Sequence, residues 1–91
     1  MNLCILYGQI ISKIEFNFFY NNKEHISVVT FLLIPKQKVI SNETEKFIIV
    51  KAYDEIADII YQNYKMLDYI YLEGYVKPKH VEVMSIENVS L

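Results

Sequence analysis

The stretch from Lys46 to Val76 changes its hydrophobic period twice. From Phe47 to Tyr53 the side chains alternate with a period of two, as on a strand that has two different faces. From Asp54 to Tyr64 the apolar residues follow a helical period, and acidic residues occupy the first turn, where the helix dipole favours anions. From Tyr69 to Val76 the period of two returns. The stretch therefore predicts a strand, a helix and a second strand.

The rest of the chain predicts strands and the connections between them. Gly8 lies inside the first strand, where a bulge or a close backbone approach would let the strand bend and serve two sheets. The predicted segments are a strand from about Asn2 to Ile14, its extended continuation from Phe16 to Tyr20, a turn at Asn21, Asn22 and Lys23, a strand from His25 to Ile34 that stops at Pro35, a polar loop from Lys36 to Glu45, a turn at Lys77, Pro78 and Lys79, and a strand from Val81 to Val89.

The length of 91 residues predicts a single domain, residues 1–91. A flat sheet in so small a chain would leave one apolar face in water, and closing the sheet removes that problem. We therefore predict an all-β fold, a five-stranded Greek-key barrel of the OB class with one helix between strands three and four. An open α+β sheet with the helix packed on one side is the alternative.

The composition limits the class of protein. Hydrophobic residues make up 53% of the chain and charged residues 22%, which excludes disorder, and the apolar runs are too short to span a bilayer. Cys4 lies among apolar residues, so we expect a small buried side chain in a reducing compartment. The first residues lack the pattern of an export or import signal, so none is expected. The formal charge of −2 argues against binding a polyanion through bulk electrostatics, so any nucleic-acid site must use local lysines and stacking.

Three stretches resemble the single-stranded DNA-binding proteins of bacteria and organelles. They are NLCILYG at Asn2 to Gly8, YDEIADIIYQNYKMLDYIYLEG at Tyr53 to Gly74, and MSIENVSL at Met84 to Leu91, and the IYLEG segment is the most specific match. The resemblance implies an OB fold that binds single-stranded DNA, with RNA as the alternative, without sequence preference and as a dimer or tetramer. The short length and a composition rich in Ile, Asn, Lys, Tyr and Phe are similar to small proteins of this kind encoded in algal plastid genomes. We therefore expect a plastid (chloroplast) protein, with the bacterial cytoplasm as the alternative.

The sequence departs from the family pattern at three places. Met66 and Leu67 stand where the family has a Lys-Gly pair at the end of the helix, so the left-handed cap must form differently. The last hairpin is shortened to the four residues from Lys77 to His80. The sequence ends at Leu91 without an acidic tail, so recruitment of other proteins by such a tail is not expected.

Aromatic residues and lysines are the candidate nucleic-acid contacts. Phe47 and Tyr53 resemble the base-stacking positions of the family, and Lys51 lies between them on the same strand face, where it can neutralise a phosphate. The alternative is that both rings are strand formers covered by a loop or a subunit. Further phosphate contacts are expected on loops, although solvated loops also explain these residues, which are Lys77, Lys79, Lys36 and Lys38.

A tyrosine-rich stripe marks the strand that follows the helix. Tyr69, Tyr71 and Glu73 share one face, and tyrosine is enriched at protein interfaces. We expect an oligomer interface here, with a second nucleic-acid surface or a place in the sheet core as the alternatives.

No residue pattern predicts catalysis or a bound metal. His25 and His80 lack the spacing of metal ligands, and the two glycines cannot build a phosphate-binding loop. We therefore expect a non-enzymatic protein with no cofactor and no metal. The rival function is an OB-fold interaction module or structural subunit that has lost nucleic-acid binding.

Overall fold

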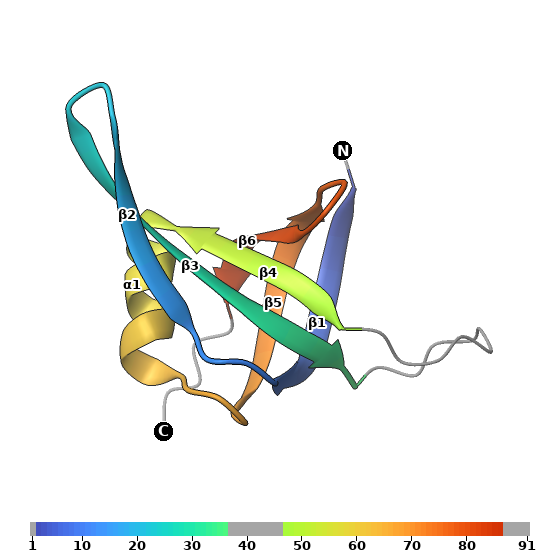
Figure 1. The fold of residues 1–91 in the computed structure, drawn as a ribbon. Coiled ribbons are helices and arrows are strands. Elements are labelled where there is room, and N and C mark those ends of the chain that lie inside the picture. The colour runs from blue at the N-terminus through green and yellow to red at the C-terminus, as the bar shows by residue number, and fades with distance from the viewer. Residues whose placement is uncertain (1, 37–46, 87–91) are drawn as a thin grey trace.

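A computed structural model describes residues 2–36 and 47–86 of the chain. These residues form six strands and one helix (Figure 1). The elements are β1 (Leu3–Ile10), β2 (Glu15–Asn21), β3 (Glu24–Pro35), β4 (Ile48–Tyr53), α1 (Asp54–Asn63), β5 (Tyr69–Val76) and β6 (Val81–Ile86). The predicted helix and the strands on both sides of it are confirmed.

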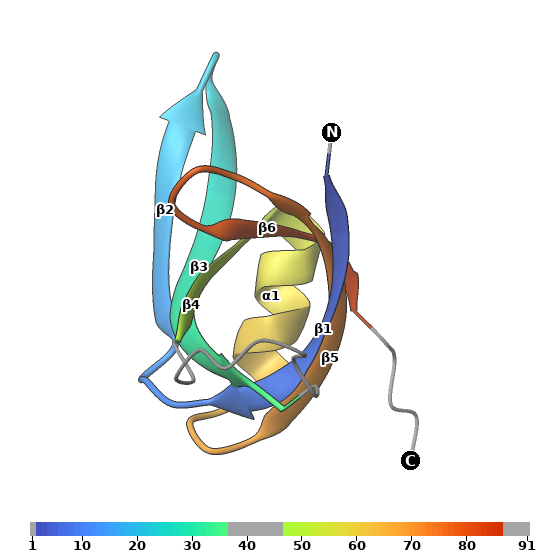
Figure 2. The same cartoon turned by 90° about the vertical axis from the view of Figure 1, so that its right-hand side faces the viewer.

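Five of the strands close into a barrel. β1 pairs with β5 along its length and with β3 at its end, β3 pairs with β4, β4 pairs in parallel with β6, and β6 pairs with β5. The helix between β4 and β5 lies across the opening of this ring in Figure 2. β2 pairs with β3 alone among the described strands and extends the sheet beyond the barrel. The prediction of an OB-fold barrel is therefore confirmed, with β2 as a sixth strand.

The bend in the first predicted strand lies later than expected. The chain leaves the strand conformation over residues 11–14, so the segment divides into β1 and β2. The N–H of Ile11 donates to the carbonyl oxygen of Leu32 (2.9 Å), and the N–H of Leu32 donates to Oγ of Ser12 (2.9 Å). The side-chain oxygen of Ser12 replaces a ladder partner at the bend, which explains why the bend is here and not at Gly8.

Of the two roles predicted for Gly8, a bulge or a close backbone approach, the structure shows the close approach. It lies opposite Pro35 of β3 and Ile70 of β5, at the point where β1 pairs with two strands. A Cβ atom on this residue would overlap the carbonyl oxygen of Ile34. The closure of the barrel between β1 and β3 therefore requires glycine at this position.

The barrel core is apolar and includes one side of the helix. α1 contributes Ala57 and Ile60, both fully buried. The largest fully buried side chains are Phe31, Ile10, Leu33, Ile60, Ile70, Leu72, Val29 and Val50. No helix within residues 2–36 and 47–86 is long and apolar enough to cross a membrane.

Two turns use left-handed backbone angles on residues other than glycine. The predicted turn between β2 and β3 is confirmed, with φ of 51° at Asn22 and 69° at Lys23. Between α1 and β5, Leu67 has a φ of 80°, where glycine is the usual residue. Its N–H donates to the carbonyl oxygen of Ile10 (2.7 Å), and its carbonyl oxygen accepts a bond from Nε2 of Gln9 (3.0 Å). These bonds to β1 hold the turn without a glycine.

Candidate nucleic-acid interface

The outer side of β3 and β4 carries the first group of predicted contacts. Lys51 and Tyr53 lie on this side, because the residues that alternate with them in β4 are fully buried in the core. Thr30 of β3 is the register partner of Lys51. The ring of Phe19, from β2, lies edge-on to the ring of Tyr53 at a centroid distance of 6.5 Å. We call Phe19, Thr30, Lys51 and Tyr53 the platform.

A groove beside the platform collects the second group. Phe47, which is 58% exposed and directly precedes β4, lines a hollow of about 400 Å³ together with Lys77 and Lys79. We call this hollow the lysine groove. Its other lining residues, which include an apolar floor from β1, β4 and β6, are Cys4, Leu6, Ile48, Ile49, Val76, Pro78, His80 and Val81. The structure thus brings three predicted contact residues from two distant segments into one site.

The platform and the lysine groove are continuous along β4. Ile49 lines the groove and, by the alternation of the strand, lies on the same side as Lys51. Lys51 is also close enough to His80, a groove residue, to influence its ionisation. A nucleic-acid strand can therefore pass from one to the other without leaving the surface.

His80 is a polar residue in an apolar part of the groove. Its Nε2 atom is buried and has no hydrogen-bond partner among residues 2–36 and 47–86. Burial lowers the pKa of His80 below its ordinary value, and the positive charges of Lys51 and Lys77 lower it further, while Glu82 opposes them. These effects favour the uncharged form of the His80 imidazole.

The depressed pKa of His80 predicts a loss of stability at acid pH. The folded state binds the proton less well than the unfolded chain, so the stability contribution of neutral His80 is complete above the unfolded pKa of about 6.5 and falls as the pH falls through the folded value. The free energy of unfolding should therefore decrease between about pH 7.5 and about pH 5 by more in the wild type than in His80→Gln. Urea titrations at both pH values measure this difference, and equal pH dependence in the two proteins would contradict it.

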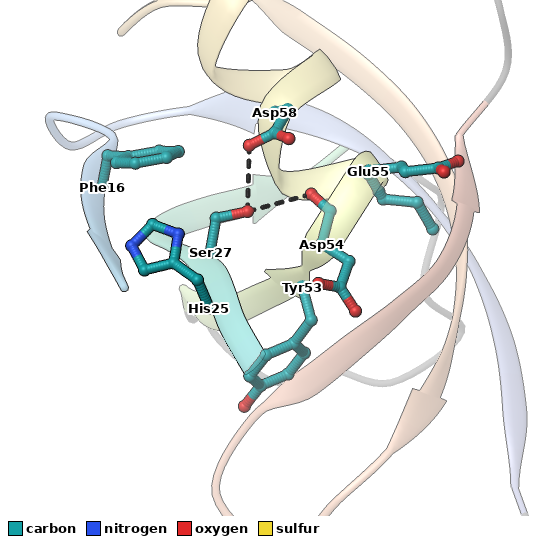
Figure 3. Close-up of a pocket in the computed structure, with 8 residues that line it drawn as sticks. Phe16, His25, Ser27, Tyr53, Asp54, Glu55 and Asp58 are labelled. Carbon is teal, nitrogen blue, oxygen red and sulfur yellow. Dashed lines mark hydrogen bonds between the residues drawn. The ribbon is translucent and has the colours of Figure 1, made fainter. Parts of the chain in front are cut away.

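A second and larger hollow, of about 660 Å³, lies between the β2–β3 hairpin and the beginning of α1, and Tyr53 of the platform also lines it (Figure 3). The hairpin contributes Phe16, His25 and Ser27, and the other residues lining it are Tyr53, Asp54, Glu55, Ile56 and Asp58. The hydroxyl of Ser27 contacts Oδ1 of Asp58 (2.9 Å) and the carbonyl oxygen of Asp54 (3.2 Å). The three carboxyl groups make this hollow unfavourable for phosphate. Among the described residues no group of His, Cys, Asp and Glu could hold a metal ion.

The predicted interface residues of β5 lie on the outside of the barrel. Tyr69, Tyr71 and Glu73 alternate with buried residues, as the period of two predicted. Tyr7 of β1 is the register partner of Tyr71, and its ring stacks on that of Tyr69 at 5.8 Å. Ile5 is the partner of Glu73 and is more than half exposed. We call this surface the tyrosine face, and its role as an interface stays a prediction.

Lys36 does not line the groove, and two residues of the site were not predicted from the sequence. Lys36 is exposed but does not line the groove, and Lys38 lies outside the described residues. Phe19 and His80 were not predicted as contacts. The turn at Asn22 and Lys23 could have indicated Phe19, because the hairpin register that it sets places Phe19 beside β3 and close to β4. No sequence signal indicated that His80 would be buried beside two lysines.

The sequence matches no model of a known protein family and no curated protein. The fold does match solved structures. The SSB domain of a Synechococcus protein superposes with a TM-score of 0.73 at 18% identity, over 97% of this chain and 96% of that one. The protein priB from Ralstonia solanacearum gives a TM-score of 0.75 at 14% identity, over 96% and 97% of the two chains. The single-stranded DNA binding protein from Thermus aquaticus gives 0.68 at 22% identity, over 100% of this chain and 41% of that one. The chain therefore has the OB fold found in SSB domains.

Proposed function

We propose that this protein binds single-stranded DNA, with RNA as the alternative, without sequence preference and without catalysing a reaction. The observation that carries the proposal is the continuity of the platform with the lysine groove. This surface has aromatic rings at both ends, with Tyr53 and Phe19 at one end and Phe47 at the other. Lys51 supplies positive charge between the two ends, and Lys77 and Lys79 supply it beside Phe47. The OB fold shared with SSB domains supports the same proposal.

The chemistry of the surface fits a flexible polyanion. Each base that stacks on an aromatic ring gains about 1–3 kcal/mol without sequence recognition, because every base has a π face. Lys51, Lys77 and Lys79 each supply a point charge for a phosphate, and without arginine no side chain can bind a phosphate through a planar fork. The acidic hollow beside Tyr53 repels phosphates, so the strand should run away from α1, across Lys51 and into the lysine groove.

Salt dependence tests the lysine contribution. In fluorescence anisotropy titrations with labelled oligo-dT, the slope of log affinity against log salt should become shallower by about 0.7 in Lys77→Ala, because one phosphate contact is lost. Lys65→Ala, which removes the same charge from the exposed turn after α1, should leave the slope unchanged. A Lys77→Ala slope equal to that of the wild type would remove this residue from the interface, and no binding at low salt would refute the proposed function.

We further propose that the protein forms a dimer or tetramer through the tyrosine face. Tyr69 is 48% exposed, and the apolar side chains beside it on β1 add area that a second subunit would bury. Light scattering at high concentration tests this, and a strict monomer near 10.8 kDa would contradict it.

We also propose that the protein acts in the plastid, on the basis of its composition. Imaging of a tagged protein would test the compartment.

The second candidate function is an interaction module that has lost nucleic-acid binding. The acidic net charge and the exposed tyrosine face favour it. The two candidates differ in one measurement, because the module forms oligomers but does not change the anisotropy of oligo-dT. Oligomer formation without such a change would support the module.

A further inference from the structure

β2 is an edge strand that, within the described part of the chain, has none of the usual protection against pairing with another chain. It pairs only with β3 among the described strands and lies at the outer margin of the molecule in Figure 2. Natural edge strands are protected by lysine, proline, a bulge or very short length. β2 has seven residues, continuous register with β3 and a single charged residue, Glu15. Its open edge is thus able to accept another strand.

The side chains that border this edge are aromatic and exposed. Phe18 is 55% exposed and Tyr20 is 74% exposed, on the side of the hairpin that carries His25. Phe19 points to the other side, toward the platform. The helix contacts this strand through Tyr61, whose ring lies 4.7 Å from that of Phe16 at the beginning of β2. Beyond that contact, the consecutive residues Phe18, Phe19 and Tyr20 expose more apolar area than is usual for a hairpin surrounded by water.

We propose that β2 pairs with β2 of a second copy of this chain in an antiparallel arrangement. The sequence EFNFFYN is self-complementary about its central residue, Phe18, which would lie opposite its own copy. Phe16 would lie opposite Tyr20, and Glu15 opposite Asn21, so the aromatic residues on the side of Phe18 meet aromatic residues and no two like charges face each other. This pair is isologous and closes at two copies, because each edge is used once.

The pairing would join the two platforms. Phe19 lies on the platform side of β2, and in the proposed register it faces Asn17 of the second copy on that same side. The two outer sheet faces would then form one continuous surface. This consequence, unlike the pairing itself, rests on the proposed binding of single-stranded nucleic acid: one strand would run across both copies.

Mass measurements without nucleic acid test the pairing independently of the proposed function. Phe18→Lys places two positive charges opposite each other and should halve the mass of the assembly in sedimentation or light scattering. Met66→Lys, an equal change at a similarly exposed position in the turn after α1, should keep the wild-type mass. Tyr71→Lys distinguishes the β2 edge from the tyrosine face. If the subunits associate only through the β2 edge, Tyr71→Lys keeps the wild-type mass. If they associate through both surfaces, the double variant with Phe18→Lys and Tyr71→Lys is a monomer. A monomeric wild type, or a Phe18→Lys variant with unchanged mass, would overturn the proposal.

Cross-linking gives a second measurement if Phe18→Lys fails to fold. Directly opposite residues of an antiparallel pair have Cβ atoms about 4.5–5.5 Å apart, close enough for a disulfide after a small adjustment. In a Cys4→Ala background, Phe18→Cys should form a covalent dimer rapidly under mild oxidation, and Met66→Cys should not. Equal rates for the two positions would show random collision and would count against the pairing.

Discussion

Replacing Tyr53 by alanine is expected to weaken the binding of oligo-dT by roughly 5-fold to 150-fold, the range that corresponds to a lost stacking energy of about 1–3 kcal/mol. Tyr53 lies at the end of β4 on the outer side of the barrel, and Phe19 meets its ring edge-on. The measurement is the anisotropy titration at a fixed moderate salt concentration.

Two further variants test whether the loss of affinity comes from the aromatic ring of Tyr53. Tyr53→Phe keeps the ring and should bind nearly as well as the wild type, because stacking does not need the hydroxyl. Tyr61→Ala removes a more exposed ring from α1, outside the platform and the lysine groove, and should leave the affinity unchanged. If Tyr61→Ala weakens binding as much as Tyr53→Ala does, the platform is not the binding surface.

Gly8→Ala is expected to destabilise the fold by about 2–3 kcal/mol, the upper part of the range for overpacked sites. The added methyl group would overlap the carbonyl oxygen of Ile34, which is backbone and cannot rotate away. β1 and β3 must then separate where they close the barrel. Small domains are stable by only about 5–15 kcal/mol, so the midpoint of urea unfolding should fall clearly.

The strand β1 itself provides the control for this prediction. Leu3→Ala changes an exposed residue of β1 and should alter the free energy of unfolding by about 0.5 kcal/mol or less. Gly74→Ala tests the same principle at a second site, because its Cβ would lie 2.6 Å from the carbonyl oxygen of Glu82. A Gly8→Ala protein as stable as Leu3→Ala would show that β1 and β3 can move apart at little cost.

The barrel could be predicted from sequence because its signals are local. The two changes of hydrophobic period between Phe47 and Val76 locate β4, α1 and β5, since a period reports directly which side chains face the core. Gly8 indicated a close approach for the same reason, because only glycine leaves space for another backbone. The position of the bend was missed, since it depends on a hydrogen bond between Ser12 and a strand twenty residues away.

The candidate site was predictable only in part, because it depends on distances between segments. Phe47 and Lys77 are thirty residues apart in sequence, and the parallel pairing of β4 with β6 brings their segments to one groove. Period and composition do not encode that pairing. The burial of His80 follows from the same contact and could not be seen beforehand. Lys36 is exposed and does not line the groove, so its phosphate contact stays a prediction.

The four-residue hairpin between β5 and β6 has a consequence for the kinetics of binding. The N–H of Lys77 donates to the carbonyl oxygen of His80 (2.9 Å), and Pro78 restricts the backbone between them. The lysines of the groove therefore project from a backbone that is already ordered before a ligand arrives, whereas a long loop would lose conformational entropy on closing over the strand. Association should accordingly occur in a single step that accelerates as salt is diluted, without a slower phase of loop rearrangement.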